Sequence, residues 1–175
     1  MEEVKDALNK FGKGVVMQSR RNLTTGKHKA SGALHRSISY DLEVYKNSFS
    51  IAFLMEEYGQ YQDKGVRGSR SSSRAPKSPF RFGSGTGKKG GLTKGIDKWV
   101  RQKGIQFRNK KTGQFMSYDS TSFLIRRSIY NKGIKPSMFF TKPFENAFKR
   151  LPDEVVDKFG LHVDDLIKHS LKDLK

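Results

Sequence analysis

Apolar side chains recur at helical spacing at the start of the chain. Between residues 4 and 16 they fall three or four positions apart, while Lys and Arg occupy the other faces. This pattern is typical of an amphipathic helix that buries one side. After a polar stretch, the segment SGALHRSI is expected to form a short turn that buries Leu34 and Ile38.

Alternating apolar and polar positions then mark two neighbouring strands. In SISYDLEVY the alternate residues from Ile38 to Val44 share one face, and in FSIAFLM those from Phe49 to Phe53 do the same. The intervening KNS is a turn. The pattern therefore predicts an antiparallel β-hairpin.

Four later segments return to the helical period. Proline opens two of them and a glycine follows the other two, which are signals of helix ends. Asp119 or Ser120 can cap the second of the four. The helices are predicted over residues 92–103, 119–132, 143–151 and 152–174.

The order of helix, strands, long loop and helices predicts an α+β fold, a small antiparallel β-sheet flanked by helices, with a long basic loop. A second, smaller hairpin is expected to turn at KTG, with Phe107 and Phe115 as its anchors. The 175 residues fit a single domain. We expect its core over about residues 4–63 and 92–151, the basic loop over about 64–91, and a C-terminal helical extension over about 152–175. The side chains expected to be buried include Phe11, Ile51, Phe53, Leu124, Ile125 and Phe144.

Positive charge is concentrated in the middle of the chain. Fifteen of the 35 Lys and Arg side chains lie between residues 64 and 111 with a single acid, Asp97, so this stretch carries +14 of the formal +18. The basic loop is rich in Gly, Ser and Pro, which argues against regular structure. We expect it to project from the core and to be disordered in part until it meets a partner. Its candidate contacts to DNA or to a neighbouring subunit are Arg67, Arg70, Arg74, Lys77, Arg81, Lys88 and Lys89.

Such a concentration of charge attracts polyanions, above all the phosphates of nucleic acids. Phe80 and Phe82 are interleaved with the cations. The chain has no zinc-finger spacing, RNP motif or recognisable helix-turn-helix, so any DNA contact is expected to be to phosphates and independent of sequence. Surface charge that serves only solubility is the plainer alternative.

Motifs for catalysis are missing. The chain has no cysteine, and its four histidines lack the spacing of a zinc site. GSGTGKK does not have the spacing of a nucleotide-binding P-loop. A metal-dependent nuclease would need carboxylates that converge in a cleft, and their spacing gives no sign of this. We expect neither an enzyme nor a bound cofactor or metal. We also expect a soluble protein of a cytoplasm, since no signal core or membrane-spanning run is found.

Two short motifs resemble those of a known family. The hairpin is preceded by the N-terminal helix and an LHRSI turn and followed by YGQYQDKG, and KGIKPSMFF later leads into a proline-led helix. Over residues 4–151 this order resembles the minor tail or tail-completion proteins of tailed bacteriophages, which join head to tail. Ser137 and Met138 stand where the family has a basic residue and a proline.

The resemblance implies an α+β subunit that forms a homo-oligomeric ring at the head–tail junction. Such a ring contacts the portal or adaptor protein and tail proteins, and it surrounds the path of the phage genomic DNA. The expected location is the neck or tail of the virion, after assembly in the host cytoplasm. The basic loop would then meet DNA by nonspecific phosphate contact. The alternative is a free, sequence-nonspecific nucleic-acid-binding protein.

Overall fold

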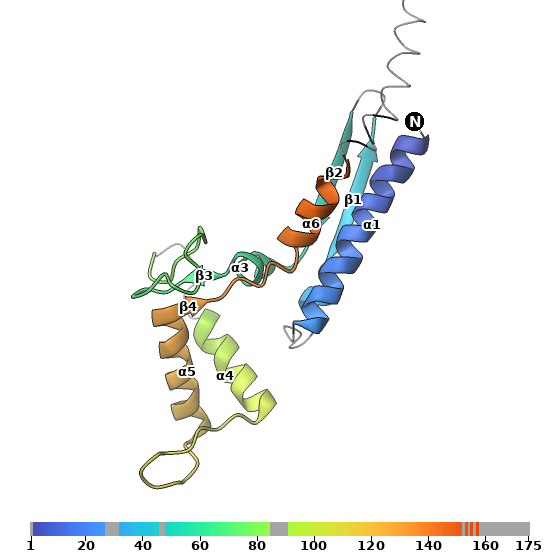
Figure 1. The fold of residues 1–175 in the computed structure, drawn as a ribbon. Helices are drawn as coiled ribbons and strands as arrows, with labels where there is room; N and C mark the ends of the chain where they lie inside the picture. Colours follow the sequence, from blue (N-terminus) through green and yellow to red (C-terminus); the bar gives the residue numbers. More distant parts are fainter. Residues whose placement is uncertain are drawn as a thin grey trace, which may run out of the picture. The chain divides into compact units, whose positions relative to one another are not determined.

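The computed structural model describes residues 2–26, 32–45, 48–84 and 91–151, together with residues 153, 155 and 157. Its elements confirm the predicted α+β class, with helices and two-stranded antiparallel sheets (Figure 1). The chain divides into two compact units, where the sequence offered no boundary. We call Met1–Gly59 with Met138–Lys175 the core unit, and Gln60–Ser137 the basic unit.

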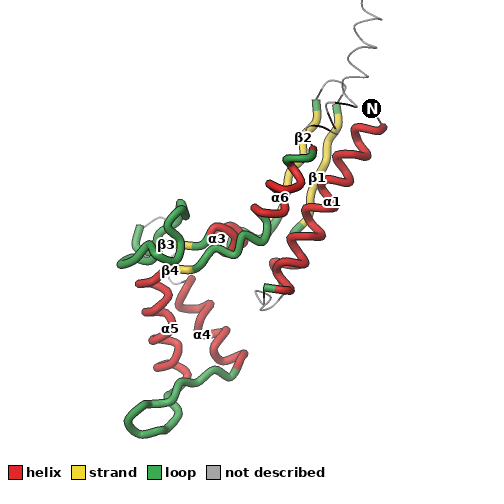
Figure 2. The backbone as a smooth tube through the Cα atoms, in the orientation of Figure 1, coloured by secondary structure: helices red, strands yellow, loops and turns green. Residues whose placement is uncertain are grey.

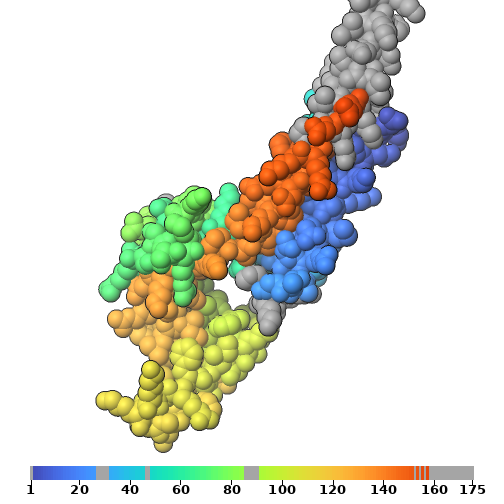
Figure 3. Space-filling view, viewed as in Figure 1, coloured from blue at the N-terminus to red at the C-terminus, as the bar shows by residue number. Residues whose placement is uncertain are grey.

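The core unit is built around the predicted hairpin. Strands β1 (Ser39–Val44) and β2 (Phe49–Leu54) are antiparallel, with Tyr40 opposite Phe53 and Leu42 opposite Ile51. The half-buried positions of β1 alternate with exposed ones, which confirms that the predicted apolar side chains share one face. That face is covered by helices α1 (Glu2–Thr25) and α6 (Thr141–Phe148), which pack side by side (Figures 1 and 3).

Aromatic rings fill the space between these helices and the hairpin. The ring centroid of Phe53 lies 6.0 Å from that of Phe11, 5.3 Å from that of Phe140 and 5.7 Å from that of Phe144. Phe11 is buried as expected, whereas Phe53 and Phe144 are half-buried. Helix α1 also packs closely on the sheet at Gly12, because a Cβ at this position would lie only 2.6 Å from the Tyr40 ring.

A second apolar cluster closes the other end of the core unit. Helix α2 (Ala33–Ser37) is the predicted turn, and it buries Leu34 and Ile38 against Leu23 and Phe139. The Leu34 amide donates to the Tyr58 hydroxyl at 3.0 Å. This contact fixes the end of the segment that follows the hairpin.

The described residues of the basic unit form three helices and a short sheet (Figure 2). Helix α3 (Gly59–Lys64) leads into β3 (Val66–Arg67), which pairs antiparallel with β4 (Gly133–Ile134). Helices α4 (Gly91–Lys103) and α5 (Tyr118–Lys132) pack against each other. Ser117 caps α5 by accepting a hydrogen bond from the Ser120 amide, so the helix begins earlier than predicted.

The buried face of α5 differs from the prediction. It runs through Thr121 and Ser122, with Ile125 half-buried beside them, while Leu124 is 39% exposed. The expectation that Leu124 is a core residue was therefore wrong. The periodicity was right for a helix, but the side that faces α4 carries small polar groups rather than the largest apolar ones.

The C-terminal extension lies mostly outside the described residues. Leu151 is buried against the α1 cluster, and Val155 is half-buried there. Residues 153, 155 and 157 are helical, in agreement with the predicted segment as far as it is described. None of the described helices has the length and apolar character needed to cross a membrane.

Candidate nucleic-acid interface

Charge is divided very unequally between the two units. The basic unit holds 19 Lys and Arg residues but only three acids, a net charge of +16. The core unit holds the other 16 basic residues and 14 acids, a net charge of +2. Nearly all of the attraction for a polyanion therefore resides in the 78 residues of the basic unit.

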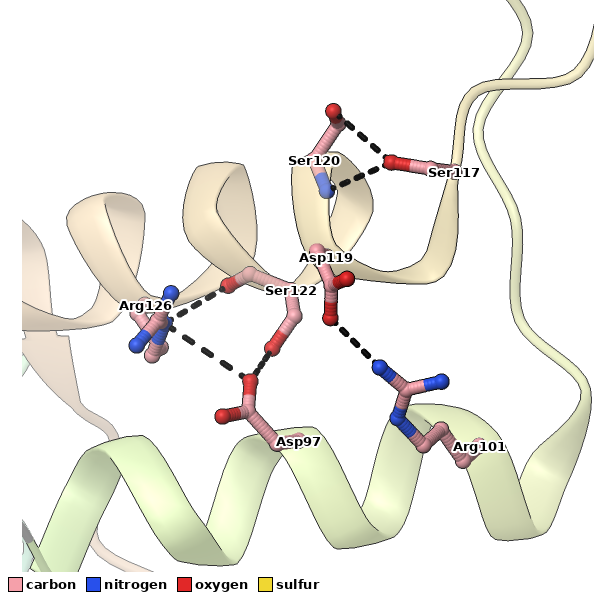
Figure 4. Close-up of polar contacts among 7 residues, drawn as sticks. All are labelled: Asp97, Arg101, Ser117, Asp119, Ser120, Ser122 and Arg126. Carbon is pink, nitrogen blue, oxygen red and sulfur yellow. Dashed lines mark hydrogen bonds and ion pairs between the residues drawn. The ribbon is translucent and has the colours of Figure 1, made fainter.

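Two of the three acids of the basic unit pair with side chains of the same unit, and the third is buried. Asp63 is 3% exposed. Asp97 on α4 accepts a hydrogen bond from the Ser122 hydroxyl and lies 4.0 Å from Nε of Arg126, both on α5 (Figure 4). Asp119 pairs with Arg101 in the same way between the two helices (Figure 4). Three carboxylates cannot balance 19 cations, so most of the positive charge faces solvent.

The first part of the basic loop does not project from the fold. Residues 69–71 donate backbone hydrogen bonds to the carbonyls of Tyr130 and Asn131 at 2.9–3.2 Å, and the Arg67 amide donates to the Phe80 carbonyl at 2.8 Å. Ala75 and Ser78 are buried, and the Ser78 hydroxyl donates to the Gly65 carbonyl at 2.7 Å. The expectation of an unpacked loop was wrong for residues 64–84, because backbone hydrogen bonds and small side chains replace the missing aliphatic core. Residues 85–90 lie outside the described part.

Three glycines let this loop meet the end of α5. A Cβ at Gly68 would lie 2.1 Å from the Asn131 carbonyl oxygen, and one at Gly133 would lie 2.2 Å from that of Val66. A Cβ at Gly65 would lie 2.5 Å from the carbonyl oxygen of Ile134. Gly65 and Gly133 also adopt positive φ angles of 70° and 86°. The two motifs that carry the family resemblance are thus joined backbone to backbone.

Phe80 and Phe82, which lie among the cations of the basic loop, help to pack this loop against the rest of the basic unit. Phe80 makes an edge-on contact with Tyr61, with ring centroids 4.6 Å apart, and Phe82 lies 5.7 Å from Tyr130. Both phenylalanines are half-buried. They anchor the loop to α3 and α5, and the sequence alone could not separate this role from contact with bases.

The predicted contact residues differ in what their side chains meet. Arg74 donates to the Gly133 carbonyl at 3.4 Å and Arg81 to the Ser69 carbonyl at 3.1 Å, so both guanidinium groups help to hold the loop. Arg67 is half-buried, and its Nε is buried without a hydrogen-bond partner among the described residues. Arg70 and Lys77 are exposed. Lys88 and Lys89 lie outside the described residues.

A second basic element was not among the predicted site residues. Residues 107–115, which we call the tip loop, lie within the connection between α4 and α5, at the end of the helix pair that lies away from β3 and β4 (Figures 1 and 2). The predicted turn is present, with Arg108 bridged antiparallel to Phe115. Its expected anchors are not buried, since Phe107 is 41% and Phe115 61% exposed. The sequence signal for this second basic element was that residues 98–118 contain no Asp or Glu.

Within the described residues, no three His, Asp or Glu side chains lie close enough to hold a metal ion. Comparison with protein-family models, with curated proteins and with solved structures found no significant match to this chain. What the protein does is therefore inferred from its own motifs and geometry.

Proposed function

We propose that the protein is a non-enzymatic structural component of a tailed-phage virion. It forms a homo-oligomeric ring at the head–tail junction, contacts the portal or adaptor protein and tail proteins, and encloses the DNA path. In this proposal the core unit carries the subunit fold, and the basic unit presents its charge to the phosphates of the passing genome.

The observation that carries the proposal is the junction of the two motifs. YGQYQDKG and KGIKPSMFF lie far apart in the sequence, yet Val66 pairs with Ile134, and the Ser137 hydroxyl donates to the Gln62 carbonyl at 2.7 Å. Two sequence motifs that resembled the family only by chance would not be expected to meet at one backbone junction. Their union around Gly65 and Gly133 supports the resemblance to tail-completion proteins.

The charge distribution supports the part of the proposal that concerns DNA. Duplex DNA carries about one negative charge per 1.7 Å of its axis, so a ring around it meets a dense polyanion. Each subunit would bring a unit of net charge +16 to that axis. The same charge favours the second candidate function, a free protein that coats nucleic acid without sequence preference.

Electron microscopy of the full-length chain and of virions separates these candidates. The ring proposal predicts closed rings in the purified protein, or antibody-gold label at the neck of particles that contain it. A chain that is absent from particles and binds DNA as a small, open species would overturn the ring proposal and support the coating protein. Light scattering on the same sample gives the mass of the species that binds DNA.

A further inference from the structure

We propose that the tip loop is a preformed phosphate-binding element, and that with it the basic unit grips the backbone of duplex DNA. The choice of DNA as the polyanion rests on the proposed function. The site itself rests on the geometry of residues 107–115, which lie outside the basic loop.

The tip loop is held in one conformation by its own hydrogen bonds. The Asn109 amide donates to the Gln114 carbonyl at 2.9 Å, and the Gly113 amide donates to the Asn109 carbonyl at 2.8 Å. The Asn109 side chain accepts from the Lys111 amide at 2.9 Å. Gly113 has a φ of 71°, which glycine adopts without strain. A loop already ordered in this way loses little conformational entropy when it binds.

The base of the tip loop is fixed to the helix pair. The Phe107 amide donates to the hydroxyl of Thr121 at 3.2 Å, and Thr121 is fully buried in α5. The Gln106 side chain donates to the Met116 carbonyl at 3.0 Å and closes the neck of the loop. The turn is therefore attached to the helix pair by hydrogen bonds at its base.

Three cations project from this support with no acid nearby in the sequence. Arg108, Lys110 and Lys111 are exposed, and no Asp or Glu occurs between residues 98 and 118. In the space-filling view the loop, drawn in yellow, forms a protruding end of the basic unit (Figure 3). Phosphate oxygens are the ligands that such a group of ammonium and guanidinium donors fits.

The arginine of the tip loop keeps its donors available. The Arg108 guanidinium lies over the ring of Phe115, 4.5 Å from its centroid. Stacking on an aromatic face positions a guanidinium while leaving its N–H groups to point outward. Arg74 and Arg81 of the basic loop differ, because each already donates to a backbone carbonyl. This arrangement also accounts for the 61% exposure of Phe115, because its ring packs under the Arg108 guanidinium rather than in the core.

The test compares two variants of the full-length chain that lose the same charge. One replaces Arg108, Lys110 and Lys111 by Ala, and the other replaces Lys5, Lys10 and Lys13, exposed lysines of α1 in the core unit. Binding to two unrelated short duplexes is measured by fluorescence anisotropy over a series of salt concentrations. Each lost phosphate contact reduces the slope of log K against log salt by about 0.9. We expect the tip-loop variant to flatten the slope by about 2–3 on both duplexes, and the α1 variant to keep the wild-type slope.

The outcomes separate this inference from the proposed function. A tip-loop variant with the wild-type slope overturns the inference, even if the wild-type chain forms rings. Equal flattening in both variants also overturns it, since the effect would then follow from net charge alone. If the tip-loop variant keeps its DNA slope but no longer joins particles, the loop binds an acidic protein surface instead. Failure of the wild-type chain to bind DNA overturns the inference too, while ring formation by microscopy still decides the proposed function.

A further variant tests the stacking. Phe115→Ala retains all three cations but removes the ring below Arg108. We expect it to weaken DNA binding, but less than Arg108→Ala, which also removes the charge, with Phe123→Ala, another exposed phenylalanine, as the control. If Phe115→Ala binds like the wild type, the ring has no part in positioning Arg108.

Discussion

The core unit and the basic unit of this protein are stabilised in different ways. Among the described residues, the buried side chains of the core unit are eleven apolar ones and Ser19, whereas those of the basic unit are three apolar and four polar ones. The core unit relies on burial of rings and aliphatic groups. The basic unit relies on backbone hydrogen bonds, close glycine contacts and buried polar pairs. A buried polar group stabilises the fold only when it has a hydrogen-bond partner.

This contrast explains how so much charge can be carried by one chain. A unit of net charge +16 repels itself, and repulsion opposes a compact state. Its fold is held by contacts that tolerate a charged surface, because many of them lie between backbone atoms. The core unit, with nearly balanced charge, can devote its side chains to packing.

The largest effect is expected at the motif junction of the basic unit. Gly133→Ala would place a Cβ 2.2 Å from the Val66 carbonyl oxygen at a φ of 86°. We expect the free energy of unfolding of this unit to fall by at least about 3 kcal/mol, from overpacking and backbone strain together. Hydrogen exchange in α5 measures it.

The matched control is Gly95→Ala in α4, where a Cβ meets nothing within 4 Å. That change should stabilise the helix by about 1 kcal/mol. Equal protection of α5 in the two variants would show that the junction does not hold the basic unit together.

The next effect is expected in the core unit. Phe53 contacts the rings of Phe11, Phe140 and Phe144, so Phe53→Ala should lower the free energy of unfolding by about 3 kcal/mol, near the low end for a buried ring because Phe53 is half-buried. Phe49 lies on the same strand and is 42% exposed, so Phe49→Ala should lower the free energy of unfolding by less than about 1 kcal/mol. Chemical denaturation measures both, and similar losses would contradict an aromatic core centred on Phe53.

A smaller effect is expected between α4 and α5. Asp97→Ala leaves the buried Ser122 hydroxyl and the half-buried Arg126 without their carboxylate, at a cost of about 1–3 kcal/mol. Asp119→Ala removes an exposed pair with Arg101 and should cost less than about 1 kcal/mol. Thermal unfolding of the two variants gives the comparison. A larger loss for Asp119→Ala would reverse the roles assigned to the two pairs.

The smallest effect is expected from salt. Raising NaCl from about 0.05 to 0.5 M screens charges over distances beyond a few ångströms. The basic unit should gain less than about 1 kcal/mol in the free energy of local opening, because repulsion among 19 cations outweighs the loss in its ion pairs. The core unit should change less. Hydrogen exchange resolved along the chain measures both, and a greater gain in the core unit would contradict the charge argument.

Several features follow from the local sequence alone, because they depend on neighbours in the chain. The period of two placed Tyr40, Leu42 and Val44 on one face of a strand, and the hairpin has the register that this face requires. The period of the N-terminal helix likewise predicted its buried stripe, including Phe11. The concentration of positive charge was also evident, since it is a count along the chain.

Other features depend on tertiary contacts, because they join residues that are far apart in the chain. The basic loop looked too polar to pack, yet Gly68 and Gly133 allow its backbone to reach the end of α5. Local periodicity could not tell which side of α5 faces α4, so Leu124 was misplaced.

The candidate interface depends on the same distinction. Composition identified the basic region, but it could not tell arginines that hold the loop, such as Arg74 and Arg81, from one that is stacked and free to bind, Arg108. That difference lies in which atoms each guanidinium meets. A guanidinium has the same charge in every sequence context, but its hydrogen-bond donors are directional, and only the folded chain determines where they point.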